Sequence, residues 1–454
     1  MSVSPARRAA LRVLERVRTR SAYAAETLDA VLSRAGLSER DAALATRLTY
    51  GTLQTVGVLD EVIDRMARRP AEIEPHVRDA LRIGAYELLF ARTPPRAAVN
   101  ESVEAVKSHR AQAAPLANAV LRRLADEATS FPWGDPATDL AARARQTGHP
   151  VWLVELLVRD LGAQRADEVL AAANEPAPLY LWHNPFVGPM ADALAALEAD
   201  GAEPALCDPP GCVVAGVPSA AVRGGAVASG RVLVTDAAAQ VAARAIAPGA
   251  DASIVELAAG RGTKTVELQA LSLAAGGVSR IWAVDLHGFK TRVLRERLAE
   301  LGVGGVTVVQ GDAADVAAIE GLPRAGTVDE VLLDAPCTGL GTLRRHPEKR
   351  WRLTEADVPA MAAVQRTLLE QAATLVRPGG VVVYSTCSLA RRENHEVVSD
   401  FLAGGTGTAF RTRSVADAVP EAWHDAIGPE GWFQSLPRLA GPDGHFVAAL
   451  ERMG

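Results

Sequence analysis

The chain has 454 residues, of which 48% are hydrophobic and 22% are charged, a composition typical of soluble globular proteins. This length exceeds what one ordinary hydrophobic core supports, so two or three domains are expected. No apolar run approaches the ~18 residues that a membrane-spanning helix needs, and Met1–Ala10 lacks the apolar core of a signal peptide. Four cysteines in so long a chain indicate free thiols in a reducing cytoplasm.

The formal net charge of −6 is unfavourable for a protein that binds phosphates, but the charge is unevenly distributed. Residues 1–130 hold 20 Lys and Arg against 16 Asp and Glu, a balance of +4, whereas the remainder holds 28 against 38, a balance of −10. The N-terminal part is therefore the better candidate for contacts with a polyanion, although its excess of positive charge is modest.

Residues 5–130 carry apolar stripes at helical spacing, for example in residues 77–88. Gly36, Pro70 and the Pro94–Pro95 pair mark expected helix breaks. Almost no strand pattern appears before residue 175. The sequence therefore predicts a helical N-terminal domain.

Short β-like runs begin near residue 178, at Leu179–Trp182, Cys212–Ala215 and Arg231–Val234. From Ser253 onward, apolar runs alternate with segments of helix length. These runs are Ile254–Leu257, Ile281–Val284, Val306–Val309, Val331–Leu333 and Val381–Tyr384. Near-continuous apolar runs suit strands that are buried on both faces of a parallel sheet, which binds its ligands beyond the carboxyl ends of its strands.

The residues that follow the first three runs suit an adenosine-type ligand. A glycine-containing loop follows the first run, where backbone can approach a ligand and a helix N-terminus favours a carboxylate. Asp285 follows the second run, where an acid typically accepts hydrogen bonds from ribose hydroxyls, and Asp312 follows the third, where it is placed to accept from an adenine amino group. A plain strand-to-helix turn for the loop and a helix cap for Asp285 are the alternatives. A dehydrogenase would share the loop and Asp285.

Two cysteines follow the fourth and fifth runs. Cys337 lies in Asp334-Ala335-Pro336-Cys337 and Cys387 in Thr386-Cys387-Ser388. A lone cysteine is most often a small buried hydrophobe, and a regulatory disulfide is a further alternative. Zinc is disfavoured because no Cys-x-x-Cys pattern or nearby His accompanies the pair, so no metal is expected. Two thiols at neighbouring strand ends favour a catalytic pair.

Methylation of cytosine C5 is a chemistry that explains why two such thiols would be wanted. A thiolate that adds to C6 makes C5 nucleophilic enough to accept a methyl group, and a base must then remove the C5 proton so that the thiol can leave. Asp334 is placed to hydrogen-bond the exocyclic amine or a ring nitrogen of the base. Spacing alone leaves open which cysteine attacks, because DNA cytosine methylases use a Pro-Cys thiol.

Over nearly its whole length the sequence resembles the RsmB/Sun type of bacterial 16S ribosomal RNA cytosine-5 methyltransferase, within the NOL/NOP/Sun superfamily. The motifs that carry the resemblance are Leu89–Glu101, Asp236–Gln240, Asp334–Cys337, Arg345-His346-Pro347 and Thr386-Cys387-Ser388. The resemblance implies a multidomain protein: an all-α, NusB-like RNA-binding domain (5–130), a small α+β linking subdomain (145–245) and an α/β Rossmann-like catalytic domain (246–454).

The resemblance also implies the roles of the site residues. Cys387 is then the nucleophile, and Cys337 serves in proton abstraction and product release. S-adenosylmethionine is the implied cofactor. The residues implied to contact it are Ala258, Ala259, Gly260, Arg261, Gly262, Thr263, Lys264, Asp285, Asp312 and Asp334. RNA, most specifically 16S ribosomal RNA, is the implied partner, and a cytoplasmic monomer without membrane contact is expected.

The cofactor loop departs from the family pattern Asp-Leu-Cys-Ala-Ala-Pro-Gly-Gly-Lys-Thr. The replacements are Glu256 for Asp, Ala258 for Cys, Gly260 for Ala, Arg261 for Pro and Thr263 for Gly. If the replaced glycine required a positive φ, Thr263 would cost on the order of 1–2 kcal/mol, unless Gly260 adopts that conformation instead. Lys264 is kept.

Two other functions remain open on the sequence. The altered loop and Trp182 favour the same chemistry on transfer RNA or at another site in ribosomal RNA. Arg261 and Thr263 favour a non-catalytic RNA-binding factor in ribosome assembly or antitermination, although both thiols are retained.

Overall fold

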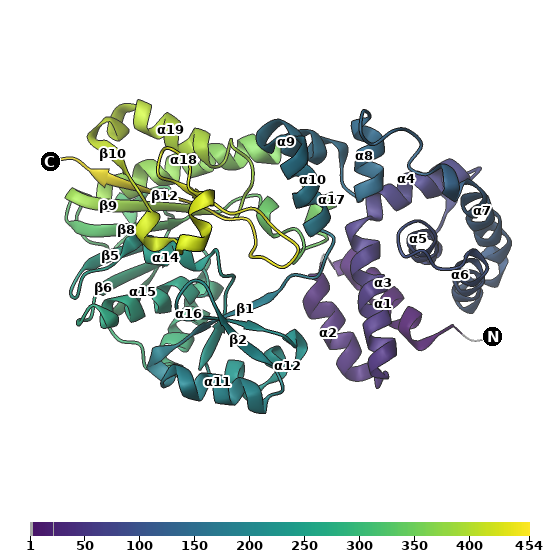
Figure 1. Ribbon diagram of the computed structural model, residues 1–454, viewed down its shortest axis with the longest axis horizontal. Coiled ribbons are helices and arrows are strands. Elements are labelled where there is room, and N and C mark those ends of the chain that lie inside the picture. The colour runs from purple at the N-terminus through teal and green to yellow at the C-terminus, as the bar shows by residue number, and fades with distance from the viewer. Residues whose placement is uncertain (1–2, 21) are drawn as a thin grey trace. The chain divides into compact units, whose positions relative to one another are not determined.

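The computed structural model describes residues 3–20 and 22–454. Its contacts divide the chain into two compact units. The first comprises the residues up to Pro176 together with Leu343–Glu355, and the second comprises Ala177–Thr342 and Ala356–Gly454 (Figure 1).

The first unit is all helical, as predicted. Its α-helices are α1 (Pro5–Arg20), α2 (Ala24–Ala35), α3 (Glu39–Gln54), α4 (Val56–Met66), α5 (Pro75–Leu89), α6 (Pro95–His109), α7 (Ala114–Glu127), α8 (Leu140–Thr147), α9 (Val151–Leu161), α10 (Ala163–Ala172) and α17 (Lys349–Arg352). The predicted breaks are confirmed. Gly36 ends α2 with φ 57°, a conformation that glycine adopts without strain, and Pro95 begins α6. Apolar stripes of α1 to α7 form one continuous core.

The N-terminal part of the second unit holds a small antiparallel sheet with strand order β2-β3-β1-β4. Its strands are β1 (Leu179–His183), β2 (Pro204–Cys207), β3 (Cys212–Ala215) and β4 (Val232–Val234), accompanied by α11 (Met190–Ala199), α12 (Pro218–Arg223) and α13 (Gly225–Ala228). The three predicted runs correspond to β1, β3 and β4. Strand β2 was not predicted, because its central residues Ala205 and Leu206 are exposed and give no buried pattern.

The main sheet has the order β10-β12-β9-β8-β5-β6-β7, with β11 paired to β12. Strands β9, β8, β5, β6 and β7 are parallel and correspond to the five predicted runs. Their bounds are β5 (Ser253–Leu257), β6 (Arg280–Asp285), β7 (Val306–Gln310), β8 (Val328–Asp334) and β9 (Val376–Thr386). Three antiparallel strands were not predicted, namely β10 (Phe410–Arg413), β11 (Phe433–Gln434) and β12 (Phe446–Arg452).

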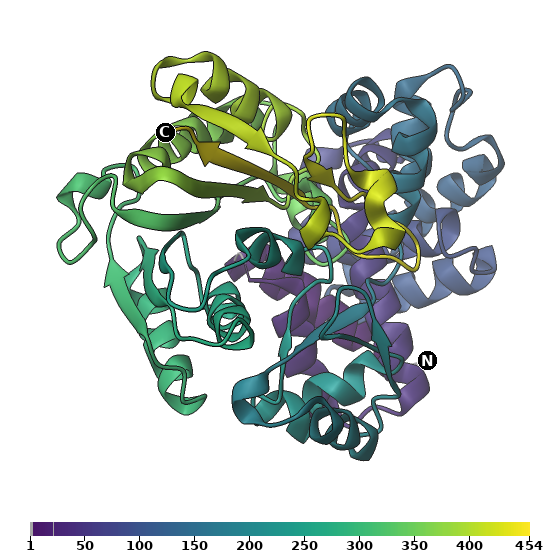
Figure 2. The same cartoon turned by 60° about the vertical axis from the view of Figure 1, so that its left-hand side comes forward.

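Helices cover both faces of this sheet. In β5, Val255 and Leu257 pack toward α18 (Asp357–Leu375) and α19 (His395–Ala403), whereas Ile254 packs toward α14 (Gln240–Ile246) and α15 (Thr263–Ala274). Helix α16 (Gly288–Glu300) lies against β6 and β7. Figures 1 and 2 show α18 and α19 on one side of the strands and α14 to α16 on the other. The alternation of side chains along buried strands produces this three-layer arrangement, and the predicted α/β catalytic domain is confirmed.

Candidate active site

The carboxyl ends of the parallel strands carry most of the residues that the sequence singled out. The loop 258–264 follows β5, Asp285 ends β6, Asp334 ends β8, and Cys387 follows β9 directly. Because these strands are parallel neighbours, their carboxyl ends lie along one edge of the sheet.

The loop after β5 adopts positive φ at Ala258 (60°), Gly260 (62°) and Gly262 (84°). Thr263 is instead the first residue of α15. The strain considered for Thr263 is therefore absent, and Gly260 is one of the residues that take the left-handed conformation. Gly262 is also required sterically, since a Cβ atom there would lie 2.0 Å from Leu294 Cδ1. The loop thus brings glycine backbone close to the N-terminus of α15, which suits the carboxylate of a cofactor.

The two predicted carboxylates after β6 and β7 differ in their setting. Asp285 is buried, and its oxygens accept hydrogen bonds from Gly260 N and His287 N, both at 2.9 Å. Asp285 therefore holds the loop 258–264 and the turn before α16, but it does not cap that helix, because the N-cap of α16 is His287. Asp312 is exposed and accepts from Ala314 N at 2.9 Å. Carboxylates at these consecutive strand ends, beside a glycine turn, fit an adenosine-type cofactor.

Lys264 links the loop 258–264 to the end of β8, donating from Nζ to Asp334 Oδ2 at 2.8 Å. Two carboxyl groups are buried close to this pair. Burial raises the pKa of Glu256 to about 8 and that of Glu267 to about 7. Glu267 was not predicted as a site residue. The sequence feature that could have indicated Glu267 is the presence of an acidic residue among apolar neighbours in the first turns of α15.

The two thiols lie side by side, with 3.3 Å between Cys337 Sγ and Cys387 Sγ, and both residues are half-buried. The hydrogen bond to Cys387 raises the pKa of Cys337 well above its usual range, as do burial and the nearby charge of Glu393. The direction of this shift favours the thiol form of Cys337 over its thiolate.

Two residues beside the thiols were missed by the sequence reasoning. Glu393 and Gln365 are fully buried and hydrogen-bonded to each other, with 2.9 Å between Gln365 Nε2 and Glu393 Oε2. Gln365 comes from the middle of α18, and nothing in its local sequence distinguishes it. Glu393 stands six residues after Cys387, and this closeness in sequence could have indicated that it belongs to the site.

The other two cysteines, Cys207 and Cys212, face each other across the β2–β3 pair, away in sequence from the catalytic elements. Within residues 3–20 and 22–454, no helix is long and apolar enough to cross a membrane, and no three His, Cys, Asp or Glu side chains are grouped to hold a metal ion.

Known families match both parts of the chain. The family described as 16S rRNA methyltransferase RsmB/F matches residues 243–451, and the NusB family matches residues 4–126. Ribosomal RNA small subunit methyltransferase B of Sodalis glossinidius is 32% identical, covering 92% of this chain and 91% of its own. A Mycobacterium tuberculosis protein, named as a methyltransferase with no substrate in its name, is 36% identical over 99% of this chain and 97% of its own.

Solved structures agree with these matches. The crystal structure of PH0851 covers all of both chains with a TM-score of 0.79 and 25% identity. The structure of NSun6 from Pyrococcus horikoshii covers 67% of this chain and 98% of its own, with a TM-score of 0.57 and 20% identity, and supports the fold. The chain therefore belongs to the RsmB-type ribosomal RNA small subunit methyltransferases, S-adenosylmethionine-dependent enzymes that join a NusB-like helical domain to a Rossmann-like catalytic domain.

Proposed function

We propose that this protein methylates C5 of a cytosine in 16S ribosomal RNA, with Cys387 as the nucleophile and Cys337 as the base that allows product release. The separation of 3.3 Å between the two sulfur atoms carries the proposal. Two thiols so close together can both reach one pyrimidine ring, which a methyltransferase acting on an amino group would not need.

The cofactor-binding residues proposed from the sequence remain Ala258 to Lys264 with Asp285, Asp312 and Asp334. S-adenosylmethionine supplies a methyl group attached to a positively charged sulfur. The glycine backbone before α15 suits its carboxylate, and the acidic residues at the strand ends suit its hydroxyl and amino groups. Lys264 places a positive charge beside Asp334, at the start of the thiol loop.

In the proposed reaction the Cys387 thiolate forms a bond to C6 of the cytosine, which makes C5 electron-rich. After C5 has been methylated, Cys337 first releases its own thiol proton to solvent, and the thiolate so formed removes the C5 proton. The electrons of that C–H bond restore the C5–C6 double bond and expel Cys387 as a thiolate. Because the pKa of Cys337 is raised, its thiolate is a strong base once it has formed.

The helical unit offers a basic surface for RNA on α1. Arg8, Arg12, Arg16 and Arg20 recur at four-residue intervals, a spacing that places them along one side of a helix. Arg8, Arg12 and Arg20 are exposed, and Arg16 is half-buried. We infer that this stripe contacts phosphates.

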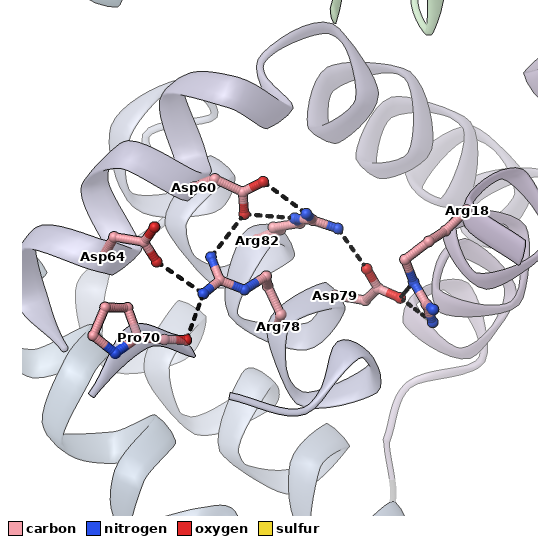
Figure 3. Close-up of polar contacts among 7 residues, drawn as sticks. All are labelled: Arg18, Asp60, Asp64, Pro70, Arg78, Asp79 and Arg82. Carbon is pink, nitrogen blue, oxygen red and sulfur yellow. Dashed lines mark hydrogen bonds and ion pairs between the residues drawn. The ribbon is translucent and has the colours of Figure 1, made fainter. Parts of the chain in front are cut away.

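Other arginines of the same unit are committed to internal ion pairs, as Figure 3 shows. Arg78 donates to Asp60, Asp64 and the carbonyl of Pro70. Arg82 donates to Asp60 and Asp79. Arg18 pairs with Asp79 as well. Because carboxylates hold these arginines, fewer arginines are available to contact RNA than the sequence suggests. The net charge of the unit also averages over these pairs, so it understates the density of positive charge along α1.

The roles of the thiols are tested by single substitutions. Cys387→Ala should abolish methylation of 16S RNA, whereas Cys337→Ala should form the C6 adduct and retain it, visible as an RNA–protein band that survives denaturing electrophoresis. Normal turnover by Cys387→Ala would contradict the proposal. An adduct formed by Cys387→Ala but not by Cys337→Ala would reverse the two roles.

The RNA target is tested separately. Bisulfite sequencing of total RNA from a strain that lacks the protein should show the loss of one methylated cytosine in 16S RNA. Loss of a mark in transfer RNA instead would keep the chemistry and move the substrate. No lost mark anywhere would favour a non-catalytic RNA-binding role.

A further inference from the structure

A buried carboxylate lies between the two thiol-bearing loops. Glu393 is fully buried and stands just before α19. It is not itself one of the two reactive residues, Cys337 and Cys387. Its Oε2 accepts hydrogen bonds from Thr338 N and Gln365 Nε2, both at 2.9 Å. Its Oε1 accepts from Ser388 Oγ at 2.5 Å and from the hydroxyl of Thr338. One side chain therefore holds the residue that follows Cys337 and the residue that follows Cys387.

Neighbouring contacts strengthen this link between the loops. Gln365 uses its second amide hydrogen to donate to Pro336 O at 2.8 Å, so it holds the residue before Cys337 as well. Asn394 accepts from Thr386 Oγ1 at 2.6 Å and donates to Ser388 O at 2.9 Å, which fixes the turn around Cys387 from both sides. Gly341 N donates to Cys387 O at 2.9 Å.

The chemistry of the site calls for a carboxylate in particular. Four donors converge on Glu393, and only an ionised carboxylate offers enough acceptor positions on two oxygens. A carboxamide of the same size would turn an NH₂ group toward two of these donors, leaving buried groups without partners at about 1–3 kcal/mol each. The four donors are a backbone amide, two hydroxyls and a carboxamide, so the carboxylate keeps its negative charge close to Cys337.

We propose that Glu393 is a positioning residue, which sets the separation of Cys337 and Cys387 so that both sulfur atoms reach the same cytosine. This inference rests on the proposed thiol mechanism. Glu393 touches neither substrate nor cofactor in this role, and acts through Thr338 and Ser388. Its charge is also one of the causes that raise the pKa of Cys337.

The decisive variant is Glu393→Gln, with Glu396→Gln as the matched control, because Glu396 is exposed and lies three residues further along the chain. The first readout needs no methylation. The rate at which Cys337 and Cys387 form a disulfide under diamide, a two-electron thiol oxidant, is followed by peptide mass mapping. We expect Glu393→Gln to slow this oxidation at least ten-fold and Glu396→Gln to leave it unchanged.

The second readout is steady-state methylation of 16S RNA. Glu393→Gln should lower kcat by ten-fold to a hundred-fold while KM for RNA changes less than three-fold, because RNA binding does not use this residue. A wild-type oxidation rate together with a wild-type kcat would overturn the inference. If Cys387→Ala remains active, the proposed function fails, yet the oxidation rate still tests the positioning role.

A second pair of variants covers the case in which Glu393→Gln does not fold. Thr338→Val keeps the shape of the side chain but removes the hydroxyl that donates to Glu393, whereas Thr338→Ser keeps the hydroxyl. We expect Thr338→Val to slow disulfide formation and lower kcat, and Thr338→Ser to restore both to within three-fold of wild type. Equal behaviour of Val and Ser at this position would contradict a role for the Glu393 contacts.

Discussion

Lys264 Nζ lies 2.8 Å from Asp334 Oδ2, so the cofactor loop after β5 is bonded directly to the strand end that leads into the Cys337 loop. The lysine side chain is only 14% exposed. Burial alone would lower the pKa of Lys264, but the Asp334 carboxylate, through its charge and its hydrogen bond, raises that pKa above its ordinary value. The lysine therefore stays charged, and it joins the loop after β5 to the strand end that leads into the Cys337 loop.

Lys264→Met should accordingly impair both cofactor binding and stability. Removing one partner of a buried ion pair leaves the other charge unpaired, at a cost of about 3–5 kcal/mol. We expect S-adenosylmethionine affinity, measured by calorimetry, to fall at least ten-fold. Lys107→Met is the control, since Lys107 pairs with Glu104 on an exposed part of α6 in the helical unit. Wild-type affinity in Lys264→Met would show that the pair is dispensable.

The two glycines of the cofactor loop should differ in their tolerance of alanine. At Gly262 a Cβ atom would collide with Leu294 at 2.0 Å, whereas at Gly260 the nearest atom is Ala258 O at 3.9 Å. Gly260→Ala should cost only the left-handed conformation, about 1–2 kcal/mol. Gly262→Ala should cost clearly more and displace α16 from the loop. Thermal unfolding measures the difference, and equal losses would contradict the steric argument.

Glu256 should make stability depend on pH. Burial raises its pKa to about 8, compared with about 4.3 in an unfolded chain. Between these two pH values the folded state holds a proton that the unfolded state has released. The free energy of unfolding therefore falls as the pH rises, and the stabilisation that is fully present below about pH 4.3 is lost by about pH 8. Glu256→Gln should flatten the decline in the free energy of unfolding between pH 5 and 8, by on the order of 3 kcal/mol.

Urea unfolding at a series of pH values measures this slope. Glu296→Gln, on the exposed side of α16, is the control for removing a carboxylate. An unchanged slope in Glu256→Gln would show that Glu256 is ionised in the folded protein at neutral pH, with Lys264 as its compensating charge.

The sequence was sufficient to predict the parallel strands and the residues at their ends, because both follow from local patterns. Apolar runs bounded by helix-length segments indicate buried parallel strands, and polar residues directly after them lie at the ligand-binding edge. Strand β12 is as apolar as the others, but it joins the sheet antiparallel to β9 and without a preceding α-helix, so the alternating pattern did not reveal it.

Contacts between distant residues could be predicted for the two cysteines, which follow strand ends, but not for residues that lack such a marker. Glu393 meets Thr338 across 55 residues, and neither belongs to the reactive pair. Residues 343–355 stand in sequence within the catalytic part, only six residues after Cys337, yet they group with the helical unit. The segment is rich in arginine, but this does not indicate its partners, because Arg350 and Trp351 donate mainly to backbone carbonyls of the N-terminal helices.

Arg350 anchors this segment and should be essential for the stability of the helical unit. Its guanidinium is fully buried and donates to the carbonyls of Gln54, Gly148 and Ala173 and to Asn174 Oδ1, at 2.8–3.1 Å. Burial lowers its pKa to about 9. Arg350→Lys keeps the charge but cannot reach several acceptors at once, because an ammonium lacks the planar fork.

We therefore expect Arg350→Lys to lower the midpoint of urea unfolding of the helical unit by an amount equivalent to about 2–4 kcal/mol. Circular dichroism follows that transition. Arg352→Lys, two residues further and exposed, should leave the midpoint unchanged. If Arg350→Lys and Arg352→Lys behave alike, the segment is not anchored by its buried arginine.

The arginine stripe on α1 should be visible in the salt dependence of RNA binding. Each phosphate contact releases counterions, so the slope of log affinity against log salt should become shallower by about 0.7–0.9 for each arginine removed. Arg8→Ala and Arg12→Ala should each show this change with a 16S RNA fragment, whereas Arg411→Ala, which breaks a surface pair with Glu451, should not. The double variant Arg8→Ala/Arg12→Ala should change the slope by the sum of the two. An unaltered slope in that variant would place the RNA-binding surface elsewhere, since the lost charge would then have no phosphate opposite it.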